Sequence, residues 1–127
     1  MKITIKTIPH SEQRYDTIGD WWFDKEDNLE IRVSSTISYY ADALVAIHEL
    51  CEALLCKARF ISEDSVTRHD LNFTGEGQPG DSPDAPYCNE HCIAEGIERI
   101  MCSALGLKWE HYERVLDTAA HWPHKKP

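Results

Sequence analysis

Side chains on one predicted helix have the types and the spacing of a metal site. In the segment Ala41 to Cys56, His48 and Glu52 are four residues apart, so on an α-helix they lie on one face, one turn apart. An imidazole nitrogen and a carboxylate oxygen are both good ligands for zinc. Glu49 points roughly 100° away from His48, which leaves its carboxylate free for a separate task beside the ion. The spacing predicts part of a metal site with a carboxylate next to it.

A catalytic zinc ion needs three protein ligands and one open position, so a third ligand must come from elsewhere in the chain. His91 and Glu95 are four residues apart on a second predicted helix. We prefer His91, because it follows a loop directly and completes a set of two histidines and one carboxylate. Glu95 is then the reserve ligand or the group that orients His91. The alternative is that these two residues form an exposed pair on a solvated helix face.

The run His48-Glu49-Leu50-Cys51-Glu52 resembles the His-Glu-x-x-His helix of zincin metallopeptidases, with Glu52 in place of the second histidine. The resemblance covers about residues 29 to 98. It implies a metal-dependent hydrolase of the metallopeptidase type, in which His48, Glu52 and His91 bind zinc and Glu49 is the catalytic base. The additional carboxylate makes Mn²⁺ or Fe²⁺ more competitive with Zn²⁺. The resemblance also implies that the strand Leu29 to Val33 aligns an extended peptide or protein substrate along its edge.

Two other classes of function stay open at this point. The first is a metal-binding protein without catalysis that acts as a binding module, which the replacement of histidine by Glu52 favours. The second is an acidic interaction protein without metal, in which His48 is a hydrogen-bonded side chain of a buried helix. A two-metal site between helices would need Glu-x-x-His pairs, which the two long helices lack. The chain also resembles small proteins encoded by bacteriophages.

Composition and charge restrict the partners. The chain has 127 residues, of which 42% are hydrophobic and 28% charged, as expected of one globular domain. It has no signal peptide and no apolar run near the roughly 20 residues that cross a bilayer, so we expect a cytoplasmic protein without a membrane partner. The net charge of −9 argues against nucleic acid, whose phosphates require a basic patch. The five cysteines are an odd number and are expected to be reduced thiols.

The expected fold is α+β, with a single domain over residues 1–127. Alternating polar and apolar residues from Lys2 to Ile8 predict a strand, and Trp21 to Phe23 with Leu29 to Val33 predict a hairpin. We therefore expect a small N-terminal antiparallel sheet of about three strands, over residues 1–33, packed on two long helices and a short third helix. The metal-type helix covers residues 38–59, with Ser38 as its N-cap.

Residues 60–86 are rich in glycine and proline and predict a covering loop. The helical region 87–120 follows, with a long helix that ends at Gly106. Both long helices have an apolar face in the sequence: Leu44, Ile47, Cys51, Leu54, Leu55 and Ala58 on the first, and Ile93, Ile97, Ile100, Met101 and Ala104 on the second. The stripe of His91, Glu95, Glu98 and Cys102 lies opposite, and is either solvated or the wall of a site.

Overall fold

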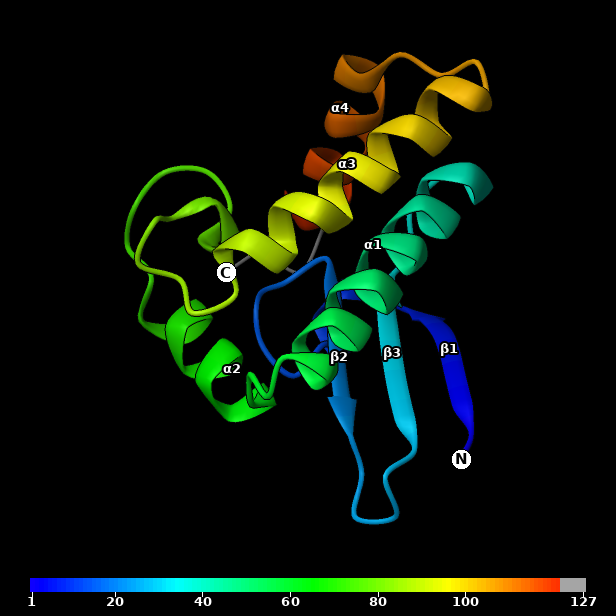
Figure 1. Ribbon diagram of the computed structural model, residues 1–127. Helices are drawn as coiled ribbons and strands as arrows, with labels where there is room; N and C mark the ends of the chain where they lie inside the picture. The colour runs from blue at the N-terminus through cyan, green and yellow to red at the C-terminus, as the bar shows by residue number, and fades with distance from the viewer. Residues whose placement is uncertain (122–127) are drawn as a thin grey trace.

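The computed structural model describes residues 1–121 and shows an α+β fold, which confirms the predicted fold class (Figure 1). The last six residues of the predicted domain, 122–127, lie outside the described residues. No helix within residues 1–121 combines the length and the apolarity needed to cross a membrane. In chain order the elements are β1 (Ile3–Ile8), η1 (His10–Glu12), β2 (Gly19–Phe23), β3 (Leu29–Ser34), α1 (Tyr39–Ala58), α2 (Glu63–Asn72), η2 (Pro79–Asp81), α3 (Cys88–Ala104) and α4 (Trp109–His121).

The sheet is mixed, so the prediction of an antiparallel sheet is wrong for one strand. The predicted hairpin is confirmed: β2 and β3 are antiparallel, and the Asp24 carboxylate closes their turn by accepting the N–H groups of Glu26 and Asn28. β1, however, pairs in parallel with β3, and the strand order is β1-β3-β2. The connection over residues 9–18 is long enough to carry the chain across the sheet, so β3 can take the centre.

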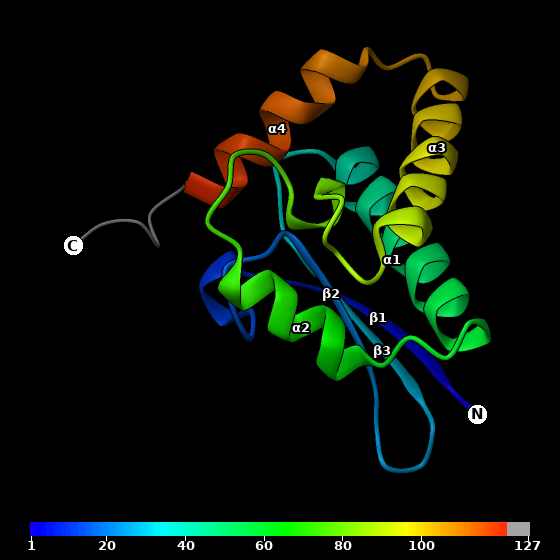
Figure 2. The same ribbon diagram turned by 60° about the vertical axis from the view of Figure 1, so that its left-hand side comes forward.

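The central position of β3 follows from its side chains. Leu29, Ile31 and Val33 alternate along the strand and are all fully buried beneath α1. A central strand has both edges paired, so the expectation that Leu29 to Val33 aligns a substrate along a free edge is wrong. β2 is the edge strand on the side of α2, as Figure 2 shows.

The ends of the two long helices agree with the sequence. The Ser38 hydroxyl accepts a hydrogen bond from the backbone N–H of Ala41 at 3.2 Å, so Ser38 is the predicted N-cap of α1. Gly106 follows the end of α3 with φ of 76°, a left-handed conformation that glycine adopts without strain.

α3 turns its apolar face away from the core, whereas α1 buries apolar and polar side chains together. On α1, Leu44 of the predicted apolar face is fully buried in the core, His48 and Glu52 are buried as well, and Leu54 is 45% exposed. On α3, Glu98 is buried and Ile100 is 70% exposed. An amphipathic helix usually buries its apolar face, so α3 has the reverse orientation. The α3 stripe of His91, Glu95, Glu98 and Cys102 was expected to be either solvated or the wall of a site. Because His91, Glu98 and Cys102 are buried, the structure favours the wall of a site.

The prediction that residues 60–86 form one loop is wrong, because α2 occupies ten of them. The helix begins after Ser62, whose hydroxyl accepts the N–H of Ser65 at 3.2 Å. Within α2 only Val66 is buried, so the segment has almost no apolar periodicity to reveal a helix.

The different burial of two paired isoleucines generates a stability prediction. Ile31 on β3 is fully buried, and its neighbour in the ladder, Ile5 on β1, is 46% exposed. We expect Ile31→Ala to lower the free energy of unfolding by about 2–5 kcal/mol, because it leaves a cavity. Ile5→Ala is the matched control and should cost roughly 1 kcal/mol or less. Urea unfolding curves measure both; equal losses would contradict the description of the core.

Candidate metal centre

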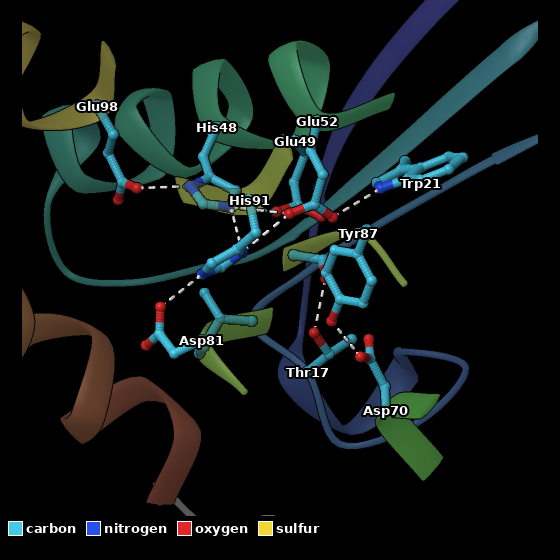
Figure 3. Close-up of polar contacts among 12 residues, drawn as sticks. Thr17, Trp21, His48, Glu49, Glu52, Asp70, Asp81, Tyr87, His91 and Glu98 are labelled. Carbon is cyan, nitrogen blue, oxygen red and sulfur yellow. Dashed lines mark hydrogen bonds and ion pairs between the residues drawn. The ribbon is translucent and has the colours of Figure 1, made fainter. Parts of the chain in front are cut away.

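Three predicted ligands from α1 and α3 meet at one point. His48 Nε2 lies 3.2 Å from Glu52 Oε2 and 3.2 Å from His91 Nδ1, and His91 Nδ1 lies 2.9 Å from Glu52 Oε2. All three side chains are buried, and Figure 3 shows them pointing toward one another. Residues that are 39 positions apart in the sequence therefore form a single triangle of ligand atoms.

The size of this triangle fits a tetrahedral zinc ion. Bonds of about 2.0–2.1 Å at tetrahedral angles put neighbouring ligand atoms roughly 3.3 Å apart. The three measured edges, 2.9–3.2 Å, are close to that value and slightly short. Three ligands also leave one tetrahedral position open, which is the arrangement of catalytic zinc sites. Metal binding itself stays a prediction.

Each candidate ligand also contacts a further residue through the atom that faces away from the triangle. His48 Nδ1 lies 2.7 Å from Glu98 Oε1, and the hydroxyl of Tyr112 donates to the other oxygen of Glu98. The indole Nε1 of Trp21 donates to Glu52 Oε1 at 3.0 Å, which leaves Oε2 for the triangle. Outer partners of this kind fix the tautomer and the direction of metal ligands. Trp21 and Tyr112 could not be predicted as part of the site from their spacing, because their contacts join distant parts of the chain.

Asp81 is the ion-pair neighbour of the outer ring nitrogen of His91, which makes no hydrogen bond within the described residues. His91 Nε2 lies 3.3 Å from Asp81 Oδ1, in the 3₁₀-helix η2 that precedes α3. Glu95 lies on the same outer side of His91, outside the triangle, and pairs with Arg99 at 3.4 Å. Glu95 is therefore not a member of the triangle. With Asp81 and His91 it forms a second group of possible metal ligands, whose atoms lie within 4.8 Å of one another, so its role as a reserve ligand stays a prediction.

Glycines make room for two of the site's side chains. A Cβ on Gly80 would lie 2.5 Å from His91 Nδ1, so only glycine lets η2 pass this close to the ring. A Cβ on Gly19, at the start of β2, would lie 2.6 Å from the Glu49 side chain. Glu49 is thus packed against the edge strand, with its Oε2 3.9 Å from His48 Nε2. At that distance the Glu49 carboxylate lies next to the triangle but is not one of its three ligand groups.

Burial and neighbouring charges shift the pKa values of the two α1 glutamates in opposite directions. Burial and the nearby Glu52 carboxylate raise the pKa of Glu49 well above its ordinary value. Burial also acts to raise the pKa of Glu52, but the hydrogen bonds from His48 and His91 outweigh it and lower this pKa to about 2. For His48, burial opposes the charged form, yet contacts with Glu52 and Glu98 raise its pKa well above the usual value. Without an ion, these contacts favour the charged form of His48.

The triangle lies in the wall of a cavity of about 820 Å³. Its other walls come from β2, α2, α4 and the segment before η2. Tyr15 and Tyr87 line it, and both donate their hydroxyl hydrogen to Asp70, Tyr15 at 2.8 Å. The site is therefore accessible from a space large enough for several amino-acid residues.

Comparisons of the chain with protein-family models, with curated proteins and with solved structures find no significant match. The geometry of the site is therefore the basis for assigning its function.

The close approach of Gly80 to His91 generates a prediction. We expect Gly80→Ala to lower the free energy of unfolding by about 1–3 kcal/mol and to shift the ring signals of His91, because the added methyl group displaces the ring. Gly96→Ala is the control: no atom lies within 4 Å of its added Cβ, and alanine in a helix should stabilise by roughly 0.5–1 kcal/mol. Denaturation curves and histidine NMR spectra test this; an unmoved His91 ring in Gly80→Ala would contradict it.

Proposed function

We propose that this protein is a metal-dependent hydrolase that cleaves peptide or amide bonds and binds one zinc ion through His48, Glu52 and His91. The observation that carries the proposal is the triangle of their ligand atoms, which has the size of one face of a zinc tetrahedron. The hydrogen bonds between Glu98 and His48 and between Trp21 and Glu52 support it, because hydrogen-bonded ligands are typical of evolved metal sites.

The neighbouring residues have the arrangement that hydrolysis requires. Zinc in this position would supply Lewis acid chemistry and make a bound water more acidic. Glu49 Oε2 is placed to take a proton from the attacking water and to return it to the leaving amine nitrogen. The packing of Glu49 against Gly19 keeps the carboxylate in that place. Burial of the cluster excludes bulk water, which strengthens electrostatic interactions inside it.

The edge strand β2 takes over the substrate-aligning role first expected of β3. Gly19, Asp20 and Trp21 line the cavity, and the outer edge of β2 is unpaired within the described sheet. An extended peptide could add to this edge by backbone hydrogen bonds, with its scissile carbonyl near Glu49. The proposed substrate class is therefore an extended peptide or protein segment.

One observation favours the alternative of a metal-binding module without catalysis. Hydrolysis needs a donor for the developing oxyanion, and the two tyrosines in the cavity both donate to Asp70. Neither hydroxyl can serve as that donor in this conformation. If no metal binds at all, the protonated His48 is the cation of the cluster and the acidic interaction protein is the remaining class.

The first prediction concerns metal content. Protein purified without an affinity tag under zinc supplementation should contain one zinc ion per chain by elemental analysis. His48→Ala should weaken zinc binding more than ~100-fold, since even outer partners contribute 10–100-fold. His111→Ala, an exposed histidine on α4, is the matched control and should bind normally. Substoichiometric zinc that His48→Ala leaves unchanged would rule out this site.

The second prediction separates the hydrolase from the binding module through two isosteric changes on α1. Glu49→Gln removes the base and keeps the size, so it should retain zinc and lose at least ~10²-fold in turnover of peptide substrates. Glu52→Gln should weaken zinc binding first, because a neutral amide is a poorer zinc ligand than a carboxylate. The measurements are zinc affinity and peptide cleavage on the same preparations.

Two results would overturn the assignment. If Glu49→Gln loses zinc as severely as Glu52→Gln, Glu49 is a ligand and cannot be the base. If Glu49→Gln retains zinc and every measurable activity of the wild type, the metal is structural and the binding-module alternative holds.

A further inference from the structure

The outer surface of the α1–α3 pair is apolar. We define the apolar helix face as Ile47 and Leu54 on α1 with Ile93, Ile97, Ile100 and Met101 on α3. Leu54 is 45% exposed, Ile93 and Ile97 are each 37% exposed, Ile100 is 70% exposed and Met101 is 36% exposed. Helical spacing puts the members on each helix on one side.

The two helices bring these side chains onto one continuous surface. α1 and α3 run antiparallel, since His48 contacts Glu98 while Glu52, one turn later, contacts His91. Both views show the helices side by side, and Figure 1 looks onto them with the sheet behind α1. The polar stripes meet inside the molecule, so the members of the apolar helix face are directed outward along the same side of the pair.

The fold and the metal centre use none of this surface. None of the six residues belongs to the core or to the partly buried residues packed against it, and the ligand triangle is formed by other residues of α1 and α3. The largest apolar patch of a typical monomer covers about 300–600 Å² and often has a function. This face therefore requires an explanation apart from catalysis.

The charge distribution indicates what the face can accept. In the chain 28% of residues are charged, yet the six members of the face are all uncharged, and so are the neighbouring positions Ala43, Cys51, Gly96 and Ala104. Two chains that each carry a net charge of −9 repel one another over most of their surface. At an uncharged face, two copies can approach without repulsion between like charges.

We propose that the apolar helix face binds a second copy of this chain in a weak dimer, so that the two α1–α3 pairs pack across a two-fold axis. With about 200 Å² for a fully exposed aliphatic residue, the five exposed members present roughly 450 Å² per chain. Two copies bury about 900 Å², which is below the ~1,200 Å² of stable interfaces and in the range of weak, transient ones. A two-fold contact needs only one patch, because each copy offers the same surface to the other.

Charge also argues against two other occupants. An anionic membrane attracts lysine and arginine, which the face lacks, and repels a chain of net charge −9. A basic protein partner would bind where the carboxylates are exposed and gain nothing from an uncharged aliphatic surface.

Sedimentation equilibrium of the full chain, from about 1 to about 200 μM, tests the proposal; this range brackets a weak dimer with an interface of this size. The wild type should reach twice the chain mass, and Ile100→Glu should weaken the dimer at least tenfold, because it buries a carboxylate on each side of the axis. Ile37→Glu changes a residue that is 92% exposed outside the face, and should dimerise like the wild type. Circular dichroism verifies that both variants are folded.

Three outcomes would overturn the proposal. The first is a wild-type chain that stays monomeric at the highest concentration. The second is a folded Ile100→Glu variant whose dimer constant equals that of the wild type. The third is a monomeric wild type that sediments with phosphatidylcholine–phosphatidylglycerol vesicles and loses this property in Ile100→Glu, which would assign the face to lipid.

Discussion

The structure depends on a cluster of ionisable side chains buried between α1 and α3. His48, Glu49 and Glu52 from α1 meet His91 and Glu98 from α3, and each is less than a tenth exposed. A buried ion costs several kcal/mol unless it is paired and hydrogen-bonded. The hydrogen bonds of Trp21, Tyr112 and the two histidines offset part of that cost. Three carboxylates beside two imidazoles form an environment that favours a cation.

This constraint explains features that apolar packing alone does not. To bring the cluster together, both helices direct their polar stripes inward. α3 therefore turns its apolar face outward, and α1 leaves Leu54 exposed while its Leu44 stays in the core. Glycines 19 and 80 are needed where the backbone passes within contact distance of Glu49 and His91. The exposed apolar helix face is thus the structural consequence of a buried polar site, and a second copy of the chain is the occupant that we infer for it.

The sequence predicts local features well and long-range pairing poorly. The spacing of His48 and Glu52, the Ser38 cap and the β2–β3 hairpin depend on neighbouring residues, and all three agree with the structure. The parallel pairing of β1 and the contact between Asp81 and His91 depend on segments that meet only in the folded chain, so spacing could not reveal them. Amphipathic periodicity located α1 and α3 but could not say which face is buried, because the usual rule assumes that apolar side chains face the core.

The most direct test of the proposed metal centre is anomalous diffraction at the zinc edge from crystals of zinc-loaded, tag-free protein. The account predicts one strong peak per chain, at about 2.0–2.2 Å from His48 Nε2, Glu52 Oε2 and His91 Nδ1, with a fourth position facing the cavity. A peak elsewhere in the chain, or zinc-saturated crystals without a peak at this triangle, would contradict it.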